Sequence, residues 1–167
     1  MQKYLETKRD AFPRFYFLSD DELLDILANA DNREIIQGYL KALFDGLVKL
    51  DMPTDDEIKG MISREGEKIE FTRTLRPSGN VEDWLKKVQQ EMRDTLLKRL
   101  KDGNKDITTG LGNNKIPTPR EKWVLSHPAQ VVTTIGMVIW CSTTEEVIGQ
   151  MYDDPLSLGN WYDQNVS

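Results

Sequence analysis

The stretch from Phe12 to Ala28 constrains the fold more than any other part of this chain. An aromatic and proline cluster, FPRFYF, runs directly into Ser19-Asp20-Asp21-Glu22 and then into a leucine-rich segment. This is a capping box, in which the Ser19 hydroxyl accepts from the Glu22 amide and the Glu22 side chain returns to the Ser19 amide. The pattern therefore predicts a helix that begins after Ser19 and buries a leucine-rich face.

The aromatic cluster itself predicts a short strand. Phe15 and Phe17 alternate with Arg14 and Tyr16, which is the period-two spacing of a strand with one buried face. Pro13 cannot donate a hydrogen bond to a neighbouring strand, so it is expected to mark the start of this strand.

Amphipathic spacing predicts helices on both sides of this stretch. A polar helix covers Lys3–Asp10 and lacks a capping signal at its start. A further helix is expected to begin after Asp31 or Asn32, because apolar residues recur at helical spacing through Leu47.

The longest predicted helix runs from Val81 to about Lys101. Its apolar stripe is regular, and Gly103 is expected to be its C-cap. Residues 103–117 are rich in Gly, Asn and Thr, which predicts a mobile surface loop.

Residues 58–75 predict a small antiparallel β-hairpin. Ile69, Phe71 and Leu75 fall on one face of its second strand, and the two strands are joined near Arg64-Glu65-Gly66. A competing interpretation places a helical turn at Thr54-Asp55-Asp56-Glu57, which also fits a capping box.

The last part of the chain predicts three helical segments. Thr118-Pro119 starts a short helix, with proline at the first helical position, that breaks near His127-Pro128. A long, well-buried helix then covers Ala129 to Ile148, and a final segment begins at Pro155. The first helix lacks a capping residue, and the last residues, DQNVS, carry no capping signal either. These two features predict that residues 1–167 are a segment truncated at both ends.

Composition limits the partners that this chain can bind. Apolar residues make up 38% and charged residues 30%, which is typical of a water-soluble and mostly helical chain rather than a disordered one. The net charge of −6 repels nucleic-acid phosphates, the acidic microtubule surface and anionic lipid head groups. We therefore expect no direct contact with nucleic acid, membrane or microtubule.

The single cysteine and the short apolar stretches predict an intracellular chain that does not cross a membrane. Cys141 excludes an internal disulfide, favours a reducing, intracellular environment, and is expected to be buried. The stretch from Ala129 to Cys141 is shorter than the roughly 20 residues that cross a bilayer. Residues 1–10 are charged, so no secretory signal is expected.

No set of residues predicts catalysis, cofactor binding or a metal site. His127 is the only histidine, whereas zinc usually needs about three or four nitrogen or sulfur ligands. The acid pairs Asp20-Asp21, Asp55-Asp56 and Asp153-Asp154 are interpreted as helix caps. The basic residues of the long helix are interleaved with acids, which favours a solvated surface; they are Lys86, Lys87, Lys98, Arg99 and Lys101, with Glu91 and Asp94 between them.

Five stretches, in the same order, resemble the linker of dynein heavy chains. They span nearly the whole chain: YLETKRDAFPRFYFLSDDELLDIL, GMISREGEKIEF, GNVEDWLKKVQQEMRDTLL, PREKWVLSHPAQVV with the following WC, and LGNWYDQNV. The first stretch is more similar to axonemal, inner-arm-type heavy chains than to cytoplasmic ones. One departure stands out, because His127 replaces a tryptophan of many relatives. The phosphate-loop pattern of the motor is also missing, since Gly110 and Gly112 precede Asn113-Asn114-Lys115 without its spacing, and the resemblance places the nucleotide sites outside this segment.

The resemblance implies a mechanical part rather than an enzyme. The fold expected is mainly α, an elongated helical bundle with a small antiparallel β-hairpin. The implied function is a non-catalytic linker that bends during ATP turnover, with ATP and magnesium bound elsewhere in the parent motor. The implied partners are neighbouring linker subdomains, AAA+ ring modules and the dynein complex, with microtubules reached only through distant parts, in the cytoskeleton of a cilium or flagellum axoneme.

Exposed hairpin residues are the candidates for contacts with neighbouring domains, namely Arg64, Glu65 and Glu67. The alternative to a linker is a free-standing helical scaffold that offers an apolar groove to a partner helix.

Overall fold

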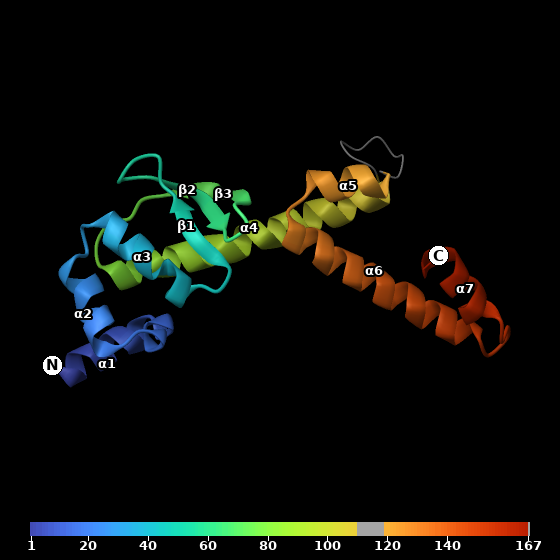
Figure 1. Cartoon of the computed structure of the whole chain (residues 1–167), viewed down its shortest axis with the longest axis horizontal. Coiled ribbons are helices and arrows are strands. Elements are labelled where there is room, and N and C mark those ends of the chain that lie inside the picture. The colour runs from blue at the N-terminus through green and yellow to red at the C-terminus, as the bar shows by residue number, and fades with distance from the viewer. Residues whose placement is uncertain (110–118, 167) are drawn as a thin grey trace. The chain divides into compact units, whose positions relative to one another are not determined.

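A computed structural model describes residues 1–109 and 119–166, which divide into two units. Unit 1 comprises Met1–Leu97 and unit 2 comprises Lys98–Ser167. Helices dominate both units, and unit 1 also contains a three-stranded antiparallel sheet (Figure 1). The predicted mainly α class with a small β element is confirmed, while the elongated helical bundle stays a prediction.

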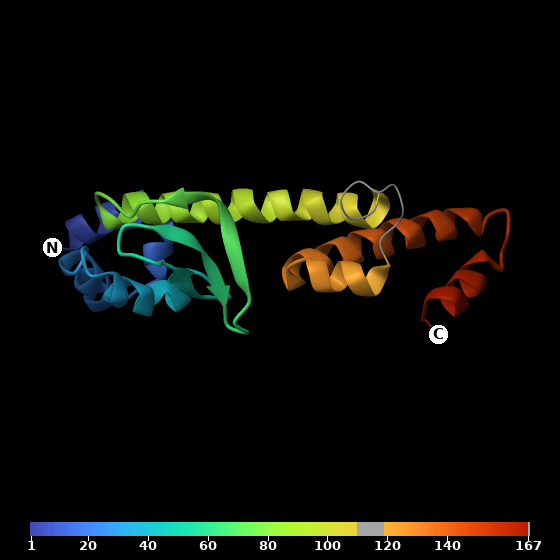
Figure 2. The ribbon, with the colours of Figure 1, turned by 90° about the horizontal axis from the view of Figure 1, so that it is seen from above.

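Unit 1 packs its sheet between helices (Figure 2). The third helix contacts the first strand, and the third strand is hydrogen-bonded to the long helix that follows it. The strand order is β1-β2-β3. In chain order the elements are α1 (Gln2–Ala11), η1 (Pro13–Phe17), α2 (Asp20–Ala28), α3 (Arg33–Leu43), β1 (Leu47–Asp51), β2 (Ile58–Ser63), β3 (Lys68–Leu75) and the first part of α4 (Val81–Thr109).

The predicted helix starts of unit 1 are confirmed. The Glu22 amide donates to the Ser19 Oγ at 3.3 Å, and the Ser19 amide donates to the Glu22 carboxylate at 2.8 Å. The Ser19 hydroxyl also donates to the Glu22 carboxylate at 2.8 Å. The bonds from the Ser19 amide and hydroxyl lower the pKa of Glu22, because both stabilise its ionised carboxylate. Asn32 caps α3 in the same way, by accepting from the amides of Glu34 and Ile35.

The predicted strand at residues 12–17 is wrong, because this segment forms the 3₁₀ helix η1. Pro13 occupies the first helical position, where its missing N–H costs nothing. Phe12 and Phe15 are fully buried and meet edge to face, with ring centroids 5.0 Å apart. Residues three apart share one face of a 3₁₀ helix, so this geometry buries both rings, while Phe17 remains exposed.

The predicted hairpin is confirmed as β2 and β3. Its turn contains Gly66 at φ +84°, a conformation that favours glycine. The sheet has one more strand than predicted, because β1 pairs antiparallel with β2. The competing helical turn at Thr54 is wrong, since Thr54 and Glu57 form an isolated β-bridge between β1 and β2.

The predicted end of the longest helix is also wrong. Gly103 is not a C-cap but lies inside α4, which continues to Thr109. A Cβ atom at Gly103 would lie 2.9 Å from Ile135 Cδ1 and 3.0 Å from Val131 Cγ1. Glycine is therefore needed here for a close helix crossing rather than for a turn. The predicted loop is helical up to residue 109, and its remainder, 110–117, lies outside the described residues.

Unit 2 continues with α5 (Arg120–Ser126), α6 (Ala129–Gln150) and α7 (Ser157–Val166). The predicted break at His127-Pro128 is confirmed, with His127 as the C-cap of α5. Pro119 is the N-cap of α5 rather than its first helical residue, and Thr118 lies outside the described residues.

The prediction that α6 is well buried is wrong. Only Val131 and Ile135 of this helix are buried, and both pack with Trp123 of α5 in the small core of unit 2. Cys141, expected to be buried, is exposed. With 22 residues, α6 is long and apolar enough to cross a membrane, although length and composition alone are weak evidence for this.

The close crossing at Gly103 makes a testable prediction. Gly103→Leu should destabilise unit 2 by about 1–3 kcal/mol, because the added carbons must displace Val131 and Ile135. The matched control is Gly136→Leu on α6, where a Cβ meets nothing within 4 Å. That change should leave stability unchanged or raise it by up to about 1 kcal/mol through helix propensity. Urea unfolding followed by circular dichroism compares them; equal stability of the two variants would contradict the crossing.

Candidate interaction sites

A nearly buried ion pair joins the N-terminal helix of unit 1 to α4. Lys8 Nζ lies 2.5 Å from Glu82 Oε1, and the two side chains are only 16% and 7% exposed. The hydrogen bond to Glu82 raises the pKa of Lys8. Glu82 also lies in the first turn of α4, where a negative charge is favoured by the helix dipole.

A second buried carboxylate joins the sheet to α4. The Glu91 side chain accepts from the Thr72 hydroxyl, from the Arg73 amide at 3.0 Å and from Arg73 Nε at 3.2 Å. Thr95 donates to the same carboxylate and accepts from the Thr72 amide. Glu91 is 2% exposed, so the prediction that it is interleaved in a solvated basic surface is wrong. Together these bonds hold β3 against α4.

Arginines satisfy carbonyls where the helices of unit 1 end. Arg33 donates to the carbonyls of Ala30 and Pro77 at 2.7 and 2.8 Å, and its guanidinium lies over the ring of Trp84. Arg14 donates to the Leu43 carbonyl at 2.7 Å and lies 4.7 Å from the ring centroid of Phe44. These cations are used inside unit 1 rather than offered to a partner.

The structure brings the three candidate contact residues together in the β2–β3 turn. Arg64 and Glu65 are exposed, whereas Glu67 is half-buried. Ser63 orders this turn: its amide donates to the Glu67 carbonyl at 2.9 Å, and its hydroxyl accepts from the Glu67 amide at 3.2 Å. Arg64 and Glu65 therefore stand on a well-ordered turn, which suits them to a contact role that stays a prediction.

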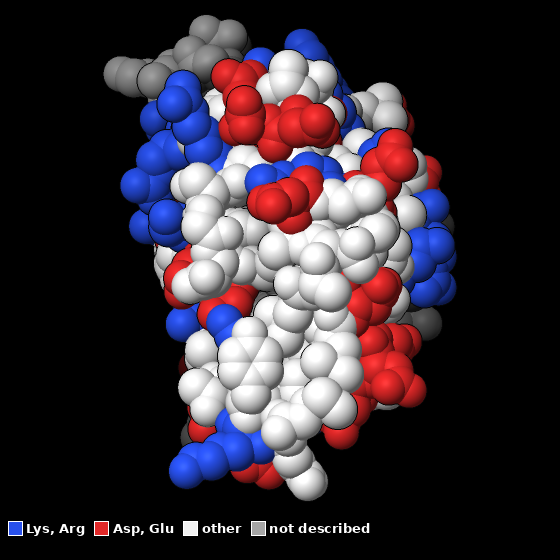
Figure 3. Space-filling view, turned by 90° about the vertical axis from the view of Figure 1, so that its left-hand side faces the viewer, with Lys and Arg blue, Asp and Glu red and all other residues white. Residues whose placement is uncertain are grey.

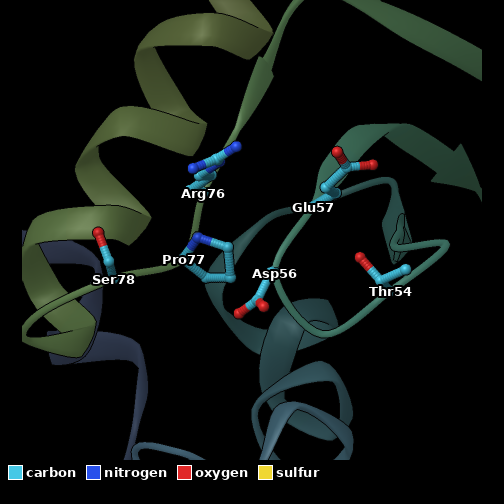
Figure 4. Close-up of a pocket in the computed structure, with 6 residues that line it drawn as sticks. All are labelled: Thr54, Asp56, Glu57, Arg76, Pro77 and Ser78. Atoms are coloured by element: carbon cyan, nitrogen blue, oxygen red, sulfur yellow. The ribbon is translucent and has the colours of Figure 1, made fainter.

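An open depression of 570 Å³ lies between the β1–β2 connection and the segment before α4 (Figure 4). Thr54, Asp56 and Glu57 line one side, and Arg76, Pro77 and Ser78 line the other. Side chains of both charge signs line this depression, Asp56 and Glu57 on one side and Arg76 on the other. A smaller depression of 420 Å³ adjoins the same connection through Asp55.

Unit 1 also has an exposed aromatic surface on α1 and η1. Its members are Tyr4, Tyr16 and Phe17, which are 54%, 60% and 67% exposed. Arg9 lies over the ring of Tyr16, and Lys8 lies over the ring of Tyr4. From this side of the molecule, a band of uncharged atoms is bordered by basic and acidic groups (Figure 3).

His127 fills a structural place in unit 2. Its Nε2 lies 3.2 Å from Asp106 Oδ2, without the alignment of a hydrogen bond, and its side chain is 8% exposed. The neighbouring Trp123 donates its indole N–H to the Gly103 carbonyl at 2.8 Å. His127 therefore helps to seat α5 on α4.

The three acid pairs take different places. Asp20 and Asp21 lie in the first turn of α2, as predicted. Asp55 and Asp56 lie between strands, and Asp153 and Asp154 lie between α6 and α7, so the helix-cap interpretation is wrong for the first of these two pairs. Within residues 1–109 and 119–166, no three His, Cys, Asp or Glu side chains are grouped as metal ligands would be.

Sequence reasoning missed the two buried carboxylates, although one of them had a readable signal. Trp84, Val88, Glu91 and Thr95 follow helical spacing, so the last two occupy core positions of the apolar stripe. A polar residue on such a stripe predicts a buried hydrogen-bond network. Glu82 had no such signal, because its partner Lys8 is far away in the sequence.

The sequence is similar to proteins of one known family. The family model described as "Dynein heavy chain, N-terminal region 2" matches residues 1–103. Dynein axonemal heavy chain 3 of Mus musculus is 38% identical over 160 residues, which cover 94% of this chain and 4% of that protein. Dynein axonemal heavy chain 1 of Homo sapiens is 37% identical over 89% of this chain and 3% of its own length.

A ciliary relative shows a similar match. The ciliary dynein beta chain of Tripneustes gratilla is 40% identical over 87% of this chain and 3% of its own length. The chain therefore spans about 3–4% of the length of the curated relatives it matches.

The Lys8–Glu82 pair makes a testable prediction. Lys8→Met should destabilise unit 1 by about 2–3 kcal/mol, because the change leaves the Glu82 carboxylate buried without its cation. The loss should be smaller than for a fully buried ion pair, because the Lys8 side chain keeps some exposure to water. The double variant Lys8→Met/Glu82→Leu should recover most of this loss. Urea unfolding at pH 7 measures both; a double variant no more stable than the single one would contradict the pairing.

The pH dependence of this pair follows from the raised pKa of Lys8. A raised folded-state pKa contributes stability in full below the unfolded value of 10.5 and loses it as the pH rises through the folded value. The difference between wild type and Lys8→Met should therefore stay constant from neutral pH to about pH 10 and shrink above it. A difference that shrinks on acidification from pH 7 to 6 would point to another group.

Proposed function

Because the chain belongs to the dynein heavy-chain family, we propose that it is a mechanical linker segment of such a heavy chain. In this role it transmits the ATP-driven conformational change of an AAA+ ring into microtubule-based movement, without catalysing a reaction itself. The observation that carries the proposal is the match of residues 1–103 to the N-terminal region of these heavy chains.

The way α4 is used supports a load-bearing role. Its first half contributes Val81, Trp84 and Leu85 to the core of unit 1, and its second half contributes Leu100 and Ile107 to the core of unit 2. An α-helix is held by hydrogen bonds along its whole length, so force applied at one end reaches the other with little deformation. A helix anchored at both ends is suited to transmit force.

The segment of α4 between its two anchored halves is the candidate for bending. Leu97 is 52% exposed, and Lys98 and Arg99 are also exposed. Leu96 packs against the core of unit 1 and Leu100 against the core of unit 2. A bend between them would therefore open neither core.

The partners and location follow from the same proposal. The segment would contact neighbouring linker subdomains and AAA+ ring modules of the same heavy chain, within a dynein complex of the cilium or flagellum axoneme. Microtubules, ATP and magnesium would be bound by distant parts of the parent motor. The isolated 167-residue chain should accordingly show no saturable, magnesium-dependent ATP binding by calorimetry.

Softening α4 tests the mechanical role. The change Leu97→Gly/Lys98→Gly, made in a heavy chain that carries these residues, adds flexibility at exposed positions and costs about 2 kcal/mol of helix stability. Microtubule gliding velocity should fall severalfold while ATP turnover persists. The matched control, Leu97→Ala/Lys98→Ala, keeps the helix and should keep the velocity; a glycine variant that glides at normal speed would contradict force transmission through α4.

The hairpin turn is tested in the same motor. Replacing Arg64, Glu65 and Glu67 by alanine removes its charged side chains but keeps Ser63 and Gly66, which shape the turn. If the turn contacts a neighbouring domain, gliding velocity should drop while the unfolding midpoint changes little. Thr74→Ala, at an exposed position of β3, is the control. Unchanged velocity in the triple variant would remove the turn from the contact surface.

A further inference from the structure

The strongest unexplained surface of unit 2 is a stripe along α6. Its members recur at alternating spacings of four and three residues and are exposed, except for Thr144, which is half-buried: Gln130, Thr134, Met137, Cys141, Thr144 and Ile148. This alternation is the spacing by which one helix packs along another. We call these six residues the α6 seam.

The α6 seam can be covered by a partner at a low desolvation cost. None of its residues is charged, and no Asp, Glu, Lys or Arg occurs between Ala129 and Thr144. The Thr134 and Thr144 hydroxyls each donate to a carbonyl one turn earlier in α6, at 2.7 Å. Because these hydroxyls already have acceptors, covering the seam leaves no hydroxyl without a partner.

The other sides of α6 are already used within unit 2. Val131 and Ile135 face the small core, and Trp140 packs against Trp161 of α7 with ring centroids 4.6 Å apart. The α6 seam lies on neither of these sides. Met137 is 64% exposed and Ile148 is 54% exposed, so none of the residues that the structure describes covers this apolar face.

We propose that the α6 seam is a docking surface for one uncharged, apolar helix face from a part of the heavy chain outside residues 1–167. This inference rests on the proposed function. The relatives extend far beyond the matched region, which is only 3–4% of their length. A segment of the same polypeptide is held at a high effective concentration and so competes well against separate molecules.

Two other occupants are set apart by the structure or by the test. A lipid bilayer would have to surround α6, but its first turns are packed closely against Gly103 of α4 and Trp123 of α5. A second copy of the chain is distinguished by experiment, because that dimer would form in the isolated chain.

Cys141 lies on the α6 seam and is the only cysteine of the chain, so it reports directly on coverage. The test measures the rate of N-ethylmaleimide labelling at Cys141 by peptide mass spectrometry. Labelling should be fast in the isolated 167-residue chain and at least about tenfold slower in a folded heavy chain that carries it, because a covered thiol reacts only after local opening. Met137→Glu in the heavy chain should restore the fast rate.

A control on the opposite side of α6 excludes general crowding. In a Cys141→Ser background, Glu146→Cys places the thiol at an exposed position off the α6 seam, and it should be labelled at similar rates in both proteins. Equally fast labelling of Cys141 in both proteins would overturn the proposal. So would a dimer of the isolated chain that dissociates on Met137→Glu, or protection of Cys141 only by added phospholipid vesicles.

Labelling and motility separate this inference from the proposed function. If Cys141 is protected in the heavy chain and released by Met137→Glu while the α4 glycine variant glides normally, the docking surface stands and the lever role fails. If gliding depends on α4 but Cys141 is never protected, the lever role stands and the docking surface fails.

Discussion

The anchoring of α4 in two separate cores is the constraint on which the rest of this structure depends. Its N-terminal half buries Trp84, Leu85 and Val88 in unit 1, and its C-terminal half lies against α6 at Gly103. Each half must present a different surface: large apolar side chains in unit 1, and in unit 2 the bare backbone of Gly103 together with Leu100 and Ile107. Neither surface can change without disturbing the core that it supports.

Buried polar groups add specificity to this packing. Glu91 binds only the part of β3 that presents Thr72 and Arg73, so it sets how the sheet is placed along α4. Lys8 and Glu82 do the same for α1. A purely apolar contact would tolerate sliding by one turn, whereas a buried carboxylate without its donors is costly. These contacts give unit 1 one defined arrangement, which suits the mechanical role proposed above.

Unit 2 has the opposite character, because its core is small and much of α6 is uncovered. An apolar helix face that is free of charge and has internally satisfied hydroxyls is stable in water only at a cost. The two units thus differ in how much apolar surface they bury: unit 1 has a large core, whereas unit 2 has a small core and leaves the α6 seam exposed. The docking proposed above would cover that seam.

Local signals in the sequence were sufficient for the elements whose hydrogen bonds close within a few residues. The capping box at Ser19, the helix start after Asp31 or Asn32, the hairpin turn at Gly66 and the break at His127 were all predicted correctly, because each depends on neighbours along the chain. The family was also recognisable from five ordered stretches. These features are determined by the sequence alone, since no distant partner is needed to form them.

Tertiary structure decided whatever depends on a distant partner. Gly103 has the sequence signature of a helix end, but the approach of Val131 and Ile135 makes it a crossing point inside α4. Phe15 alternates as in a strand, yet burying it beside Phe12 requires a 3₁₀ turn. The apolar residues of α6 predicted burial, but burial needs a second surface, and the described residues supply one for only part of the helix. The amino-acid composition determines how much apolar surface a chain carries. Only the fold determines which part of that surface is buried.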